Sequence, residues 1–86
     1  MEVAITAKAK EDLVFWRKSG NFSIQNKISK LIASTLVTPY DGLGKPEPLK
    51  YELTGTWSRR INKEHRMVYE VEDNKIIILS LKGHYE

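Results

Sequence analysis

Three runs with the character of β-strands follow one another in residues 57–82, WSRRINKEHRMVYEVEDNKIIILSLK. Apolar, aromatic and β-branched residues mark these runs, which cover Trp57–Asn62, Met67–Glu72 and Lys75–Lys82. Asp73-Asn74, between the last two runs, is typical of a tight turn. The last run contains Ile76–Leu79 without polar alternation, which predicts a central strand covered on both faces. This part of the chain therefore predicts an antiparallel sheet.

The first half of the chain favours one strand and two helices. Glu2–Thr6 alternates like a short strand, and Thr6 can cap a helix over Ala7–Ser19. A second helix is expected after a cap at Ser23, and Pro39 stops it. Its apolar face repeats with helical spacing: Ile24, Ile28, Leu31, Ile32 and Thr35.

The element order is β-α-α-β-β-β, with an ordered loop over Tyr40–Pro48. Two helices joined by a short turn form a hairpin, and its apolar face needs a partner layer. The predicted fold is α+β: an N-terminal strand and a helical hairpin packed on a small twisted antiparallel sheet. Residues 1–86 are expected to form a single domain.

The composition narrows the class of protein. The 86 residues are 41% hydrophobic and 29% charged, as in globular domains. The chain has no cysteine, which removes disulfides, thiolate metal sites and cysteine nucleophiles and favours a reducing cytoplasm. No apolar run has the length of a membrane span, and Met1–Lys10 lacks the pattern of a secretory signal.

The net charge of +3 comes from one part of the chain. Between Lys45 and Arg66 six basic residues stand against three acidic ones, whereas the rest of the chain is neutral overall. A local basic excess suits an anionic partner, with nucleic acid as the first candidate. The alternative is a solvated surface that binds nothing.

Two candidate features lie within this basic stretch. Pro46 and Pro48 restrict the backbone on both sides of Glu47, so its carboxylate has a stiff base. Arg59 and Arg60 are adjacent on a strand and point to opposite faces, so one can be buried while the other serves a ligand. The simpler interpretations are a solvated glutamate, a surface arginine and a salt-bridged arginine.

Two more candidates lie closer to the C-terminus. Arg66 can hold a phosphate by a two-pronged hydrogen bond, or it can pair with Glu64 at a hairpin tip. His84 and Tyr85 follow the apolar strand directly, so they are either anchored by it or frayed. A histidine titrates near neutral pH, as a proton donor must.

Taken together, these residue types suit RNA cleavage without a metal. RNA carries its own nucleophile, the 2′-OH beside the phosphate, so the attack already has the advantage of proximity. A protein then has to remove the 2′-OH proton, stabilise charge on the phosphate and protonate the leaving oxygen. The composition permits this scheme without establishing it. A single-stranded RNA-binding module that uses Trp57, Arg59 and Arg60 is an alternative.

Several motifs resemble one known family. They are Gly44–Lys50 (GKPEPLK), Leu53-Thr54-Gly55, Trp57–Ile61 (WSRRI), Glu64–Tyr69 (EHRMVY) and His84-Tyr85. On these motifs the chain resembles the YoeB (Txe/YoeB) toxins of the RelE superfamily, most densely over residues 38–85. The resemblance implies a RelE-like fold and a ribosome-dependent mRNA endonuclease, the toxin of a type II toxin–antitoxin system in the bacterial cytoplasm.

The resemblance also implies a mechanism and partners. Such toxins cut mRNA in the ribosomal A site through 2′-OH attack, with no metal or other cofactor, and so inhibit translation. Glu47 would be the general base, His84 the general acid and Arg66 the cation that stabilises the transition state. The residues expected to place the phosphate and the base are Lys50, Arg60 and Tyr85. A homodimer and a cognate antitoxin protein are the expected protein partners, beside mRNA and ribosomal RNA.

The chain departs from the family pattern near its end. Gly83 and Lys82 stand where the family commonly has a bulky aromatic residue and a basic one, and Gly83 is expected to loosen the backbone. Glu86 is an additional residue that brings carboxylates near His84 and favours its imidazolium form. A ParE-like toxin that binds its target without cutting RNA is a further alternative, because fold alone does not fix function.

One geometric expectation concerns Arg60 and Arg66. Both must lie on one face of the sheet if they bind one phosphate. In a hairpin, a loop with an odd number of residues, or a bulge with the same effect, puts them together, and a two-residue loop separates them. The shared-site hypothesis therefore predicts an odd loop.

Overall fold

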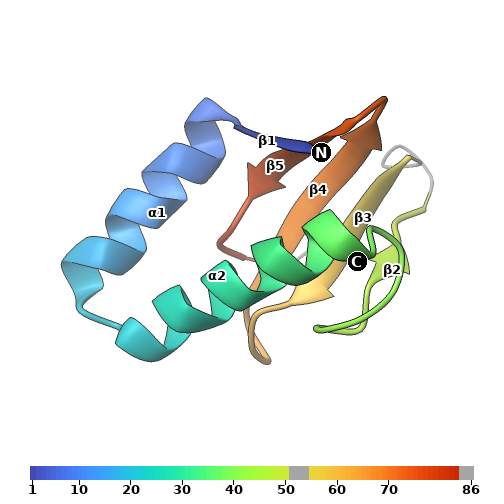
Figure 1. The fold of residues 1–86 in the computed structure, drawn as a ribbon. Coiled ribbons are helices and arrows are strands. Elements are labelled where there is room, and N and C mark those ends of the chain that lie inside the picture. Colours follow the sequence, from blue (N-terminus) through green and yellow to red (C-terminus); the bar gives the residue numbers. More distant parts are fainter. Residues whose placement is uncertain (51–54, 84–86) are drawn as a thin grey trace.

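The computed structural model describes residues 1–50 and 55–83 and confirms the predicted α+β architecture (Figure 1). Five strands form one sheet in the order β1-β5-β4-β3-β2. Their bounds are Glu2–Ile5 for β1, Glu47–Pro48 for β2, Thr56–Arg60 for β3, Arg66–Glu72 for β4 and Lys75–Ser80 for β5. The part from β5 to β2 is antiparallel, as predicted, whereas β1 joins β5 in parallel. The sheet is therefore mixed.

Each helix begins at a capping side chain. The helices are α1 over Ala7–Ser19 and α2 over Phe22–Val37. Thr6 caps α1 as predicted, because its Oγ1 accepts a hydrogen bond of 3.2 Å from the backbone N–H of Ala9. The predicted cap of α2 at Ser23 is wrong, since Asn21 Oδ1 accepts from the N–H of Ile24 at 3.1 Å. Within the described residues, no helix is both long and apolar enough to cross a membrane.

The helices share one core with one face of the sheet. α2 contributes the predicted positions Ile24, Ile28 and Leu31, and α1 contributes Ala9 and Trp16. The sheet contributes alternate residues of β4 and β5: Met67, Tyr69, Ile76 and Ile78. β5 lies between β1 and β4, which confirms its predicted central place, but only one of its two faces is fully buried rather than both as predicted. Its residues on the opposite face, Ile77 and Leu79, are half-buried.

The short strand β2 falls within the predicted loop and was not expected. Glu47 pairs with Ser58, and Pro48 pairs with Trp57, at the free edge of the sheet. Proline has no N–H and is tolerated in strands mainly at such edges. A strand of two residues, one of them a proline, also shows no alternation that could reveal it. The pairing fixes the backbone of Glu47 against β3.

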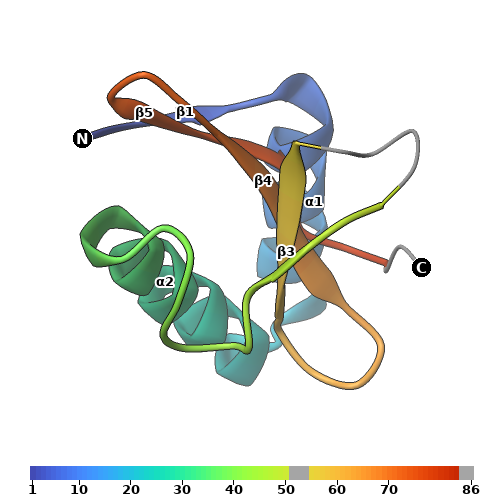
Figure 2. The same cartoon turned by 90° about the vertical axis from the view of Figure 1, so that its right-hand side faces the viewer.

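Arg59 and Arg60 point to opposite faces of β3, which confirms the alternation expected from the sequence. Arg59 is fully buried on the helix side, whereas Arg60 is exposed. The guanidinium of Arg59 donates hydrogen bonds to five oxygens, on Ser34, Thr38, Asp41, Leu43 and Tyr69. Arg59 therefore fastens the connection from α2 to β2, which passes in front of α2 and then crosses β3 in Figure 2.

Two further bonds complete this attachment. The carbonyl of Gly44 accepts a 2.7 Å hydrogen bond from the backbone N–H of Arg60, just before the chain enters β2. The hydroxyl of Tyr69 donates to the carbonyl of Pro39 at 2.7 Å and accepts from Arg59 Nε at 3.1 Å. Burial raises the pKa of this hydroxyl, and the hydrogen bond and charge of Arg59 oppose the shift. The connection is thus held at both ends.

Candidate active site

A glutamate and an arginine from two different strands form an ion pair on the sheet face opposite Arg59. Arg66 Nη1 lies 3.1 Å from Glu47 Oε1. The side chain of Arg66 is 18% exposed and that of Glu47 58%, so the carboxylate is accessible from solvent. The register explains the meeting, because Glu47 pairs with Ser58, and Ser58 in turn pairs with Val68 on the strand that Arg66 begins.

Arg60 joins this pair from β3. It lies directly opposite Arg66 in the ladder, and directly opposed residues share a face. Five residues, 61–65, separate the two arginines, so the prediction of an odd connection and a shared face is confirmed. Two like charges directly opposite each other repel, and a single carboxylate offsets only one of them. Among these three side chains, one positive charge is therefore left without a carboxylate, which suits an anion such as a phosphodiester.

The backbone next to the predicted general acid is bonded to the same strand. The carbonyl of Gly83 accepts a 2.8 Å hydrogen bond from the backbone N–H of Arg66, and the Gly83 N–H donates to His65 Nδ1 at 2.9 Å. The expectation that Gly83 loosens the chain did not anticipate these bonds. The backbone adopts φ +86° at this glycine, a conformation that L side chains rarely take.

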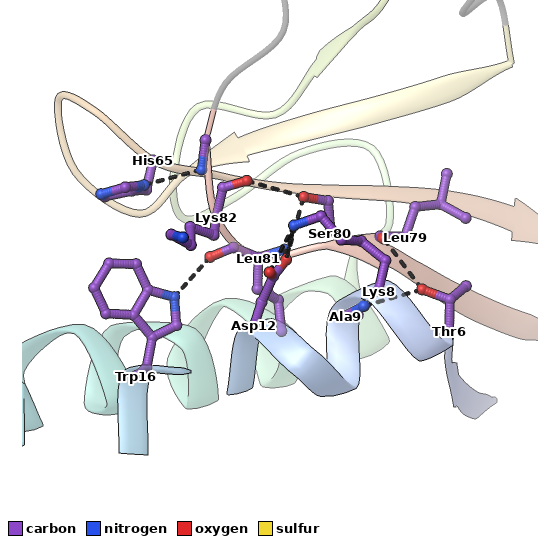
Figure 3. Close-up of polar contacts among 11 residues, drawn as sticks. Thr6, Lys8, Ala9, Asp12, Trp16, His65, Leu79, Ser80, Leu81 and Lys82 are labelled. Atoms are coloured by element: carbon purple, nitrogen blue, oxygen red, sulfur yellow. Dashed lines mark hydrogen bonds and ion pairs between the residues drawn. The ribbon is translucent and has the colours of Figure 1, made fainter. Parts of the chain in front are cut away.

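Helix α1 holds the segment just before Gly83 (Figure 3). Trp16 Nε1 donates to the carbonyl of Leu81 at 2.9 Å, and Asp12 Oδ2 accepts from the Leu81 N–H at 2.9 Å. The Trp16 ring also meets the His65 ring edge-on, with centroids 4.8 Å apart. Asp12 is itself buried and paired with Lys8 at 2.6 Å. The C-terminal end of β5 is therefore held from two sides.

Sequence reasoning missed this group of positioning residues, Asp12, Trp16 and His65. The only signal for it was the spacing of Asp12 and Trp16, four residues apart on one helix face. His65 was seen only as part of a motif. Trp16 and Asp12 both bond to the backbone of Leu81, which lies more than 60 residues further along the chain. No local pattern in the sequence points to this contact.

The structure thus brings together three of the six predicted site residues, Glu47, Arg60 and Arg66. Lys50 is exposed and forms no hydrogen bond or ion pair with the described residues. His84 and Tyr85 lie outside the described residues, as does the additional Glu86. Lys82 places its ammonium 4.0 Å from the centre of the Phe15 ring.

This arrangement can perform proton transfer beside a bound phosphate. An accessible carboxylate on a stiff backbone can accept a proton, and arginines match phosphate oxygens in charge and geometry. No group of three or more His, Cys, Asp or Glu side chains able to hold a metal occurs within residues 1–50 and 55–83.

Solved structures identify the class of protein that this fold represents. A YoeB/ParE toxin from Agrobacterium tumefaciens has a TM-score of 0.94 and 39% identity, over 99% of this chain and 100% of that chain. The toxin in a YoeB-YefM complex from Staphylococcus aureus has a TM-score of 0.88 and 43% identity, over 99% and 98%. YafQ from Escherichia coli, at 15% identity and a TM-score of 0.78, shares the fold alone. The protein has the fold of the RelE-like toxins.

Sequence comparison then gives the family. The family model for the YoeB-like toxin of bacterial type II toxin-antitoxin systems matches residues 5–85. Toxin YoeB of Escherichia coli K12 is 42% identical over 85 residues, 99% of this chain and 100% of the relative. Toxin YoeB of Synechocystis is 42% identical over 86 residues, 100% and 99%. The chain belongs to the YoeB-like toxins of type II toxin–antitoxin systems, which confirms the resemblance seen in the sequence.

Proposed function

We propose that this toxin is an endoribonuclease that cleaves mRNA in the ribosomal A site and thereby inhibits translation. The observation that carries the proposal is the Glu47–Arg66 ion pair of 3.1 Å, with Arg60 on the same face. A toxin that only binds its target has no need of an accessible carboxylate held between two prolines and beside two arginines. Membership in the YoeB-like family supports the same activity.

The proposed reaction uses the chain's own side chains and no metal. Glu47 accepts the proton of the 2′-OH, and the 2′-oxygen attacks the neighbouring phosphorus. As that bond forms, the bond from phosphorus to the 5′-oxygen breaks, and His84 donates a proton to the leaving oxygen. The products are a 2′,3′-cyclic phosphate and a 5′-OH end. Arg66 stabilises the charge that builds on the phosphate, and a base and an acid each contribute roughly 10²–10⁴-fold.

The ion pair with Arg66 also positions Glu47 before the substrate binds, because Arg66 Nη1 holds its Oε1 at 3.1 Å. When a phosphate enters, Arg66 can exchange the carboxylate for phosphate oxygens. Glu47 is then released beside the 2′-OH. Lys50, Arg60 and Tyr85 are proposed to place the phosphate and the base.

The proposal includes two protein partners. Relatives from Staphylococcus aureus have been solved as a YoeB-YefM complex and as a YoeB dimer. The latter has a TM-score of 0.90 and 42% identity to this chain. By analogy, we assign this toxin a cognate antitoxin and a homodimeric state. Its place of action is the bacterial cytoplasm, where the ribosomes are.

The test is translation of a defined mRNA on purified ribosomes with mapping of the cut sites. Glu47→Gln keeps the shape of the side chain and removes the proton acceptor, so the cleavage rate should fall at least about 100-fold. Glu72→Gln makes the same change at an exposed position of β4 and should cut like the wild type. Cosedimentation with ribosomes should be unchanged in both variants.

Three outcomes would contradict the proposal or its chemistry. Cleavage that survives both Glu47→Gln and His84→Ala would exclude these residues as the acid–base pair. Inhibition of translation without any cut mRNA would favour the non-catalytic alternatives, a ParE-like target binder or an RNA-binding module. The products also test the chemistry, since a 3′-phosphate that never passes through a cyclic form would exclude 2′-OH attack.

A further inference from the structure

A groove runs between α2 and the turn that joins β3 to β4, beyond the Glu47–Arg66 pair. It consists of two adjoining hollows of about 600 and 320 Å³, which share Lys27, Ile61 and Asn62 as lining residues. In Figure 1 this turn lies directly below α2. We call it the α2–turn groove. Arg60, one of the candidate site residues, is also among the lining residues of the smaller hollow.

The lining of the groove is strongly basic. Five cations line it: Lys27, Lys30, Lys45, Arg60 and Lys63. Among the described residues, no aspartate or glutamate lines either hollow. The first turn of α2, where the helix dipole is positive, also has no acidic residue. Cations gathered without carboxylates repel one another, so a polyanion in the groove lowers their energy.

The uncharged polar residues in the groove supply donors. The side-chain oxygen of Asn21 accepts from Ile24, and that of Asn62 accepts from the backbone N–H groups of Glu64 and His65. Both oxygens serve the fold, which leaves the amide Nδ2 groups as donors. Asn26 and Ser23 line the same hollow. Donors of this kind contact phosphate and sugar oxygens in nucleic-acid complexes.

The lining of the groove argues against two other kinds of ligand, single-stranded bases and the apolar surface of a protein. No aromatic residue of the described part of the chain lines either hollow, although stacking on aromatic rings is the usual way to hold single-stranded bases. Its apolar residues Ile24 and Ile61 are 8% and 6% exposed, so they offer no anchor for the buried apolar centre of a protein interface. The lining therefore fits a sugar–phosphate backbone better than bases or a peptide.

We propose that the α2–turn groove binds the backbone of structured RNA without reading its sequence. This inference rests on the proposed function, since the groove extends from Arg60 and would hold RNA next to the cleaved strand. Structured RNA is recognised mainly through its phosphates and 2′-OH groups, which the lysines and amides of the groove match. Lys27 and Lys30 line the groove, are not among the candidate active-site residues and lie outside the basic stretch of residues 45–66.

The experiment measures binding of an RNA hairpin by fluorescence anisotropy over a range of salt concentrations. The test variant is Lys27→Gln/Lys30→Gln, and the matched control is Lys10→Gln/Lys75→Gln. The control removes the same charge from α1 and from the start of β5, away from the groove lining. Each lost phosphate contact should lower the slope of log K against log salt by about 1, so the test variant should lose about 2. Its affinity at 0.1 M salt should fall at least about tenfold, with the control within about twofold of the wild type.

The outcomes separate the groove from the catalytic proposal. Binding does not depend on cleavage, so a wild type that binds through the groove and cuts nothing would refute only the nuclease. Equal losses of affinity in the test and control variants would show a response to net charge alone and would refute RNA binding in the groove. An unchanged salt slope in the test variant would overturn it as well. A polyglutamate peptide that displaces the hairpin at matched charge concentration would assign the groove to an acidic protein partner and refute RNA binding.

Discussion

Replacing Arg59 by lysine tests how the connection from α2 to β2 is held. The guanidinium donates five hydrogen bonds from full burial, two to side-chain hydroxyls and three to backbone carbonyls. A lysine ammonium has three donors on a single nitrogen, so Arg59→Lys leaves at least two of these oxygens without a donor. Hydrogen bonds to charged groups contribute about 1.5–3 kcal/mol each, which gives a loss of about 3–6 kcal/mol. Domains of this size are stable by roughly 4–13 kcal/mol, so the variant should lose a large share of its free energy of unfolding.

The assay is denaturation in urea, followed by circular dichroism, with Arg60→Lys as the neighbouring control. Arg60 is exposed on the opposite face, so its variant should stay within about 0.5 kcal/mol of the wild type. A variant of Arg59 that is already unfolded without urea would agree with the upper part of the expected loss. A difference of less than about 1 kcal/mol between the two variants would refute the reasoning. It would mean that water or a rearranged loop satisfies the five oxygens.

Three further predictions concern single positions. Gly44→Ala should destabilise the fold by about 1–3 kcal/mol more than Gly20→Ala in the same urea assay. A Cβ added at Gly44 would lie 2.6 Å from an α2 side chain, whereas nothing lies within 4 Å of one added at Gly20. Equal losses in the two variants would contradict the close approach at Gly44. The pKa of Tyr69 is raised, so the folded state keeps a proton that the unfolded chain releases above pH 10. The wild type should therefore lose stability from pH 9 to 11 faster than Tyr69→Phe. Parallel curves of stability against pH for the two proteins would exclude this linkage. His65→Asn offers an oxygen at the position of Nδ1, so the Gly83 amide should stay protected from hydrogen exchange. His65→Leu offers no acceptor and should speed this exchange about tenfold. NMR measures the exchange rate in both variants.

Local patterns in the sequence predicted much of the fold. The apolar spacing of Ile24, Ile28 and Leu31 fixed the buried face of α2, since a helix repeats every 3.6 residues. The alternation of side chains along a strand predicted that Arg59 and Arg60 point to opposite faces of the sheet. Both features arise from neighbours in the chain, whose geometry is set by the backbone alone. The motif residues Glu47 and Arg66 were identified by resemblance, and the structure then showed that they touch.

Contacts between distant parts of the chain could not be predicted in this way. β1 pairs with β5 across 73 residues, and nothing in Glu2–Ile5 indicates the parallel direction. Asp12 lies in a segment whose pattern indicates only a helix, yet its side chain binds the backbone of Leu81. Likewise, the lysines of α2 join the basic stretch of residues 45–66 only in space. Such pairings depend on how whole elements pack, which leaves no periodic signal in either segment.

The prolines around Glu47 also affect assembly. A free sheet edge displays unpaired N–H and C=O groups and can recruit a strand from another molecule. β2 is such an edge, but Pro46 and Pro48 have no N–H to donate, so an incoming strand would find an interrupted ladder. The residues that stiffen the carboxylate thereby protect the site from being covered by a foreign strand. One short sequence, Pro-Glu-Pro, thus both stiffens the backbone that carries the candidate base and interrupts the hydrogen-bond ladder at the edge of the sheet.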